Sequence, residues 1–331
     1  MLLRPRKAVS AAVAALALAA GGLAALATEG RAAASEACAA ATHSVLAAAD
    51  AQVLGNIYAN ELAGQEVSDD LAEIAANEAL LAAVSQDDGV ATLAAVKKLV
   101  YHPAWHIVRL RVLDASGRLL ADFGGPYVIA PVSGVLRSAS GALIGSFVMS
   151  VQDDVGVTKL EQRFVGDPIA IYAGGRLVAQ LGAGSFPRTP PSAGTLALGG
   201  VRYLAVTRTY NAFPSGTLRA VIFVPPPAIS ATVQSCSMVR AAEFGRVAAR
   251  LTGLLGPVAQ HYYGYAYWVH VYTAAKVFVL DPAGTVLASS DGSDPPALPL
   301  SGSVTYEGQN WLVFSFEPQP PVRVFLLVPP G

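Results

Sequence analysis

Apolar residues recur at three- and four-residue spacing over the first hundred positions, which is the pattern of helices that bury one face. Residues 36–63 show it most clearly, and Gly64 is a suitable stop. Ser68-Asp69-Asp70 is a cap signal for a second helix, with apolar positions at Leu71, Ile74, Ala75 and Leu80. A third, short helix is expected over residues 89–100, before Pro103.

The pattern then changes to alternation, which predicts strands. Residues 106–113 and 118–123 flank the turn Asp114-Ala115-Ser116-Gly117. The remaining segments with strand patterns are residues 127–132, 134–137, 143–151, 168–172, 176–181, 195–198, 201–209, 217–224 and about 265–328. Helices are expected over 155–164 and about 229–255. The expected fold class is therefore α+β: a long N-terminal helix packed on antiparallel sheets that are repeated two to three times.

The chain repeats itself. Residues 112–122 (Val-Leu-Asp-Ala-Ser-Gly-Arg-Leu-Leu-Ala-Asp) match residues 279–289 (Val-Leu-Asp-Pro-Ala-Gly-Thr-Val-Leu-Ala-Ser), and residues 171–179 form a looser copy. Residues 194–225 and 303–329 also share an order of strand, Gly turn, aromatic strand, Pro break and apolar end. Self-similarity of this kind implies related supersecondary units. We expect units over residues 35–165, 166–228 and 229–331.

Composition narrows the function classes. Of 331 residues, 53% are apolar and 14% are charged, with a net charge of −1, which excludes intrinsic disorder and opposes nucleic-acid binding. Only the N-terminus supplies an apolar run long enough to span a bilayer. Arg4, Arg6 and Lys7 precede the uncharged segment 8–27, and small-residue cleavage sites follow. Residues 1–34 are thus expected to be a secretory signal peptide, or alternatively an uncleaved anchor, which predicts a secreted or extracytoplasmic protein.

Two cysteines follow that segment, Cys38 and Cys236, each just ahead of an Ala-rich helical stretch. An even count in an oxidising compartment favours a disulfide between them, and two buried thiols are the alternative.

The arrangement of long helix, further helices and five-stranded sheet resembles the PAS-like fold. Residues 110–122, 141–154 and 174–224 carry the likeness. In exported proteins this plan is similar to Cache-type extracytoplasmic sensor modules of bacteria. The resemblance implies a concave ligand site on the sheet. Amino-acid-sensing relatives often end the fifth strand in Asp, and Ser150 takes that position in this chain.

Arg109 and Arg111 alternate onto one strand face, opposite Leu110 and Val112. The apolar face is expected to pack on the long helix, and the arginine face to line the ligand site, where two guanidiniums could fork an anion. The other candidate ligand-binding residues are Tyr127, Asp122, Ser150 and Asp153, with Trp105 as a further wall. The alternatives are a solvated face, or pairing of the arginines with Asp122, Asp153 or Asp154.

Residues 261–272 hold the densest aromatic run, His-Tyr-Tyr-Gly-Tyr-Ala-Tyr-Trp-Val-His-Val-Tyr. Such a run can form a platform for sugars or peptides, although strand residues packed across a sheet are the favoured interpretation.

Enzyme signatures are missing from the sequence, as is metal-ligand spacing, so neither catalysis, a cofactor nor a metal is expected. The leading hypothesis is an extracytoplasmic sensor-type module without its own output domain. It would bind a small anionic molecule such as an organic acid or amino acid and act through a membrane receptor partner. The alternative hypothesis is a cell-envelope interaction or structural protein that uses the aromatic run.

Overall fold

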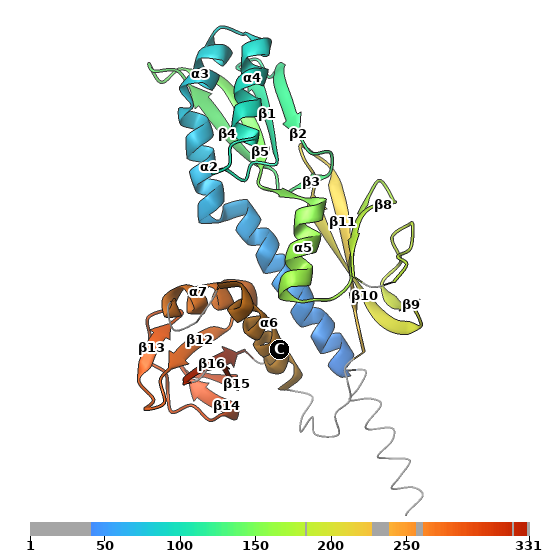
Figure 1. Ribbon diagram of the computed structural model, residues 1–331, viewed down its shortest axis with the longest axis vertical. Coiled ribbons are helices and arrows are strands. Elements are labelled where there is room, and N and C mark those ends of the chain that lie inside the picture. Colours follow the sequence, from blue (N-terminus) through green and yellow to red (C-terminus); the bar gives the residue numbers. More distant parts are fainter. Residues whose placement is uncertain (1–40, 183, 227–237, 256–260, 320, 330–331) are drawn as a thin grey trace, which may run out of the picture.

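The computed structural model describes residues 41–182, 184–226, 238–255, 261–319 and 321–329. The expected export segment 1–34 and the pair Cys38 and Cys236 lie outside these residues. Figure 1 shows an elongated molecule in which a helix over residues 41–63 runs diagonally past three sheets. The first sheet lies at the top, the second to the right and the third to the lower left.

The helices α2 (Gln65–Ala76), α3 (Glu78–Ser85) and α4 (Gly89–Val100) cover the first sheet. The predicted cap at Ser68–Asp70 was wrong, because α2 already begins after Gly64. The Ser68 hydroxyl donates back to the Gly64 carbonyl, as a serine inside a helix does. Asn77 and Asp88 are the side chains that cap α3 and α4.

All strand pairs in the three sheets are antiparallel. The first sheet has the order β2-β1-β5-β4, formed by β2 (Leu119–Gly124), β1 (Arg109–Asp114), β5 (Leu143–Ser150) and β4 (Val132–Arg137). The short strands β3 (Val128–Ile129) and β6 (Gln152–Asp153) pair with each other. They lead into α5 (Asp154–Phe164), which connects the first sheet to the second.

The second and third sheets share one strand order, in which the first strand of each unit pairs with the last. The second has the order β8-β7-β11-β10-β9, from β8 (Arg176–Leu181), β7 (Ile169–Ala173), β11 (Thr217–Val224), β10 (Val201–Asn211) and β9 (Gly194–Leu198). The third has the order β13-β12-β16-β15-β14, from β13 (Val286–Ser289), β12 (Lys276–Leu280), β16 (Val322–Val328), β15 (Gln309–Gln319) and β14 (Ser301–Tyr306). The expected α+β class with repeated antiparallel sheets is confirmed.

The repeated turns have the same geometry. The N–H of Gly117 donates to the Asp114 carbonyl over 3.0 Å, and the N–H of Gly284 donates to the Asp281 carbonyl over 3.0 Å. Both glycines have φ of +86°, a conformation that a side chain disfavours. The same turn chemistry therefore joins β1 to β2 and β12 to β13.

The sequence predicted that the helix over residues 41–63 packs on the first sheet's apolar face, and this prediction was wrong. Leu54 lies in the core of the second sheet, and Val53 and Ile57 lie in the core of the third. The apolar side of the first sheet, including Leu110 and Val112, packs on α2 to α4 instead. Because the three helices that follow the bend at Gly64 already cover that face, the long helix is left to join the other two units.

The aromatic run was also assigned wrongly, since it forms α7 (Tyr262–Thr273) and not a strand. Tyr265, Val269 and Tyr272 are buried at helical spacing against α6 (Val239–Leu255) and the third sheet. The β propensity of the aromatic residues is overridden by this tertiary packing. Tyr263 and Tyr267 remain 74% and 53% exposed.

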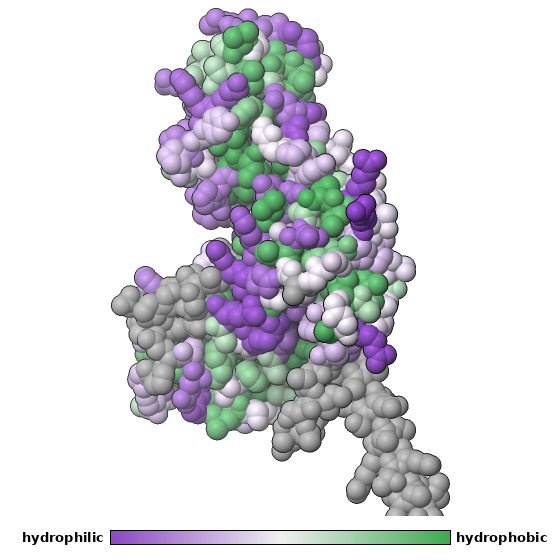
Figure 2. Space-filling model, turned by 45° about the vertical axis from the view of Figure 1, so that its right-hand side comes forward, coloured by the Kyte–Doolittle hydropathy of each residue, from purple (hydrophilic) through white to green (hydrophobic). Residues whose placement is uncertain are grey.

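Among the described helices, none has the length and apolarity that crossing a membrane requires. Figure 2 shows apolar side chains on one face of the molecule in small groups separated by polar ones.

Candidate functional site

The arginines predicted to bind a ligand lie on the face of β1 that is turned away from the helices, and they are already paired. In the β1–β2 ladder, Arg111 is directly opposite Asp122. Arg109 donates to both carboxylate oxygens of Asp122 over 2.8 and 2.9 Å, and Arg111 donates twice to Oδ2 over 2.9 and 2.6 Å. One carboxylate therefore occupies the fork that an anionic ligand would need.

The triad of Arg109, Arg111 and Asp122 is held together within the first sheet and is contacted by the second. Burial alone would raise the pKa of Asp122, but the hydrogen bonds and charges of Arg109 and Arg111 outweigh burial and hold it below its usual value. Phe213, from the loop between β10 and β11, lies 5.0 Å from the Arg109 guanidinium and 5.9 Å from that of Arg111. The triad is thus the stacking surface for a neighbouring loop.

Two of the remaining predicted residues are used in other hydrogen bonds. Ser150 is the backbone partner of Arg109, but its buried hydroxyl donates to the carbonyls of Ile129 and Gln152. Asp153 caps α5 by accepting from the Gly156 N–H over 2.6 Å. Tyr127 is 40% exposed. These residues form the crossing from the first sheet to the second.

The equivalent face, turned away from the helices, differs in each sheet. In the second sheet it is filled by buried aromatic side chains, Tyr172, Phe186 and Phe223. In the third sheet it carries Phe278, Phe325 and Leu327 beneath the segment 290–300. One end of this third face is hollow.

The hollow is a cavity of about 660 Å³ at the ends of β12, β15 and β16. Apolar residues, several of them prolines, form part of its lining: Leu280, Pro282, Pro295, Pro296, Leu298, Leu300, Pro321 and Phe325. Its charged groups are Asp281, Glu317 and Arg323. The Arg323 Nε donates to Glu317 Oε1 over 3.1 Å, and the two side chains form an ion pair. Asp281 accepts from the Thr285 N–H over 2.8 Å, and this bond lowers the pKa of Asp281.

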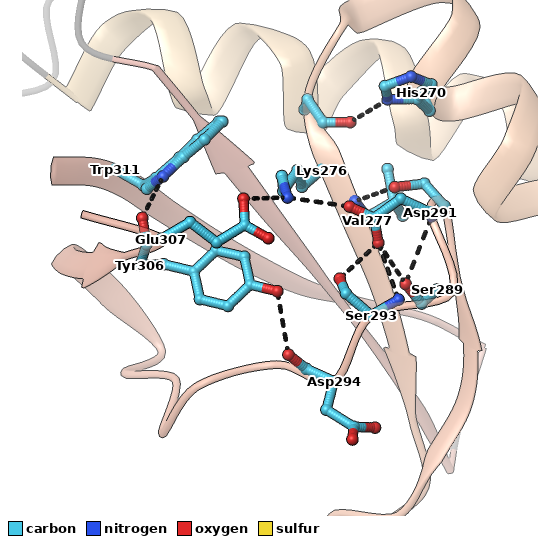
Figure 3. Close-up of polar contacts among 12 residues, drawn as sticks. His270, Lys276, Val277, Ser289, Asp291, Ser293, Asp294, Tyr306, Glu307 and Trp311 are labelled. Atoms are coloured by element: carbon cyan, nitrogen blue, oxygen red, sulfur yellow. Dashed lines mark hydrogen bonds and ion pairs between the residues drawn. The ribbon is translucent and has the colours of Figure 1, made fainter. Parts of the chain in front are cut away.

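The opposite end of the same face is closed by the network around Lys276 (Figure 3). The Lys276 ammonium lies 2.9 Å from Asp291 and 2.6 Å from Glu307, and 4.9 Å from the centre of the Tyr306 ring. Burial would lower the pKa of Lys276, but these two carboxylates raise it. The network fixes the start of the covering segment, so this charge is used to hold the third unit together.

A second cavity, of about 410 Å³, lies where the 41–63 helix, the turn after α5, the end of β11 and α6 meet. Asp50, Asp167 and Glu243 line it, together with Arg246. Sequence reasoning missed this cluster, although the sequence contains one signal for it. Asp50 lies four residues from both Leu46 and Leu54, inside the apolar stripe of its helix.

Comparison with known proteins adds little to the site. No family model matches the chain, and no curated protein matches it. A solved structure, the extracellular ligand binding receptor from Desulfohalobium retbaense DSM5692, is 11% identical with a TM-score of 0.15. The match covers 86% of this chain and 39% of that one, so the chain spans about two fifths of the receptor's length.

Proposed function

We propose that the chain is an extracytoplasmic, sensor-type binding module whose ligand occupies the cavity of the third sheet. The observation that carries this proposal is the difference between the three equivalent sheet faces. The first is occupied by an internal ion-pair triad and the second by aromatic side chains, whereas the third keeps a cavity of about 660 Å³. That volume falls within the range of small-molecule sites.

The lining favours a small zwitterion, such as an amino acid. Arg323 is the cation of the lining. Its Nε and Nη2 already donate to Glu317, so its Nη1 would bind the ligand carboxylate, while Asp281 and Glu317 would accept from an ammonium group. The apolar and proline-rich walls would enclose the carbon skeleton at little cost in ordering. The proposal keeps an anionic group in the ligand but moves its partner from Arg109 and Arg111 to Arg323.

The extracytoplasmic location rests on the sequence of residues 1–34, with their basic start, apolar run and small-residue cleavage sites. The proposal assigns recognition to the cavity and no catalytic step. A membrane receptor partner would bind the ligand-bound form of the protein.

The second candidate function, an envelope interaction, is favoured by α7. This helix exposes Tyr263, and Tyr267 lines a groove with Asn56, Asn60, Gln65, Ser68 and His270. An aromatic ring beside amides and hydroxyls is a surface that can recognise a sugar or a peptide. Capture of a polymer that is lost in Tyr267→Ala, without any small-molecule ligand, would favour this function.

A thermal-shift screen of the protein against amino acids, organic acids and sugars tests the leading proposal, because binding to the folded state raises its stability. We expect a zwitterion to raise the Tm of the wild type and to lose that effect in Arg323→Gln. Arg137→Gln, which changes an exposed arginine on β4, is the control and should keep the effect.

Two results would contradict the proposal. One is a ligand whose effect survives in Arg323→Gln. The other is a ligand whose effect is lost in Arg109→Gln alone, which would return the site to the first sheet.

A further inference from the structure

The cavity between the 41–63 helix and α6 brings three carboxylates to one guanidinium. Asp50, Asp167 and Glu243 are 1%, 5% and 7% exposed. Arg246 donates to Glu243 over 2.8 Å and to the carbonyl of Val165, and its nearest nitrogen is 3.8 Å from Asp50 Oδ1. Arg246 therefore neutralises Glu243. Asp50 is hydrogen-bonded to the side chains of Asp167 and Glu243, and neither aspartate has a counter-charge at hydrogen-bonding distance.

Several carboxylate oxygens of this cluster are buried without a hydrogen-bond partner. Among the described residues, Asp50 Oδ1 and Asp167 Oδ2 are buried and have no hydrogen-bond partner. Both carboxylate oxygens of Glu161 are also buried without a partner. A buried polar atom without a partner destabilises the folded state, and more so when it is charged. A cluster with several such atoms needs either protons or a cationic partner.

The cavity has the form of a site for a molecule with a carbon skeleton. Its volume is about 410 Å³, and Leu46, Val224, Pro225 and Pro226 supply apolar walls next to the carboxylates. No three acidic, histidine or cysteine side chains of the described residues are placed to hold a metal ion. An alkyl chain that ends in a positive charge would satisfy both parts of the lining.

We propose that this cavity is a second binding site and that it takes a small organic cation, an aliphatic amine or diamine. The ammonium group would take the place of the proton that the carboxyl groups of Asp50 and Asp167 share and would donate to both, and the methylene groups would contact Leu46 and Val224. Since Asp50, Asp167 and Glu243 come from three separate elements, the bound amine would link the long helix, the start of the second unit and the first helix of the third.

The surrounding titratable groups set the pH dependence of binding. Glu161 and Arg250 face the cluster from α5 and α6, and Arg250 donates to the Gln162 carbonyl over 3.1 Å. His43, on the long helix, bonds to the Val224 carbonyl over 2.9 Å. Burial raises the pKa of Asp167 to about 6 and that of Asp50 far higher, so Asp50 must release its proton when an ammonium binds, and Asp167 must do so at pH 5.5 but not at pH 8. Affinity should rise with pH, by up to about tenfold per unit for each proton released.

Calorimetric titration with 1,4-diaminobutane and butylamine, in phosphate buffer between pH 5.5 and 8, tests this proposal. We expect both amines to bind the wild type, with higher affinity at pH 8. Asp50→Asn and Asp167→Asn should each weaken binding at least tenfold. Asp69→Asn, an exposed acid on α2, is the matched control and should bind as the wild type does.

Three results would overturn the proposal: no heat of binding with either amine, equal binding by Asp50→Asn, or binding of calcium chloride but not of amines. The first would mean that the carboxyl groups simply share protons. Circular dichroism shows whether each variant is folded. Arg323→Gln should keep amine binding, so failure of the zwitterion site and failure of this site are distinguishable.

Discussion

Asp50 is a carboxyl group buried on the apolar face of a helix. It lies in an apolar helix stripe, and burial together with Glu243 and Asp167 raises its pKa far above the ordinary value. Its neighbours Glu161 and Asp167 are shifted in the same direction, again chiefly by burial. At neutral pH the folded protein therefore holds protons that the unfolded chain would release.

This shift has a definite consequence for stability. The unfolded carboxyl groups ionise near pH 4, so above that pH the folded state binds more protons and the free energy of unfolding falls as pH rises. We expect the Tm of the ligand-free protein to be lower at pH 8 than at pH 5.5. Groups whose pKa is lowered on folding, such as Asp122, stabilise the folded state when ionised, and this stabilisation is lost only at more acidic pH.

Asp50→Asn identifies the source of that pH dependence, because asparagine keeps the shape and cannot ionise. The variant should unfold at a higher temperature than the wild type at pH 8, and its Tm should change less between pH 5.5 and 8. Thermal unfolding followed by circular dichroism in amine-free buffer measures both quantities. A variant that follows the wild type at every pH would show that Asp50 is not the group that titrates.

At the scale of elements, the joint between the first and second sheets depends on Phe213. Its ring is buried over Arg109 and Arg111, and the backbone N–H of Phe213 donates to the Val128 carbonyl over 2.9 Å. The polar face that the sequence assigned to a ligand is therefore covered in part by a loop from the next unit.

Phe213→Ala should lower the free energy of unfolding by about 3 kcal/mol, the usual cost of truncating a buried phenylalanine. Urea denaturation followed by circular dichroism measures the change. Tyr263→Ala removes an exposed ring from α7 and should stay within about 0.5 kcal/mol of the wild type. Equal stability of Phe213→Ala and the wild type would mean that the loop does not hold the two sheets together.

Most elements were predictable because their signals are local. The turns at Asp114 and Asp281, the stripe of the long helix and the alternation in β1 each depend on a few neighbouring residues. The identity of α7 was not predictable in this way. Its aromatic residues favour strands, and only burial of Tyr265, Val269 and Tyr272 against α6 and the third sheet makes it a helix.

The candidate sites were harder to predict than the fold. Alternation placed Arg109 and Arg111 on one face correctly, but nothing in the sequence decides between a ligand and Asp122, thirteen residues after Arg109, as their partner. The cavity around Asp50 joins residues from positions 46 to 246, so its composition depends on how the three units pack. No pattern of neighbouring residues marks Arg323 as a binding residue. Its surroundings come from residues 280–284 and 295–300, which are distant in the sequence.

At the scale of the whole molecule, three sheets of related design differ in how they fill the same face, and the helix over residues 41–63 joins the second and third sheets. The first two faces are completed by the chain itself, and the third keeps a cavity between Arg323 and the proline-rich segment 295–300. The proposed function therefore assigns binding to the third unit.

The most direct test of this account is hydrogen–deuterium exchange with and without a saturating zwitterion found in the screen. The account predicts slower exchange in residues 295–300 and 317–325, at the cavity of the third sheet. Exchange over residues 109–124 should be unchanged. Protection centred on 109–124, with none around Arg323, would contradict the assignment of the binding site to the third sheet.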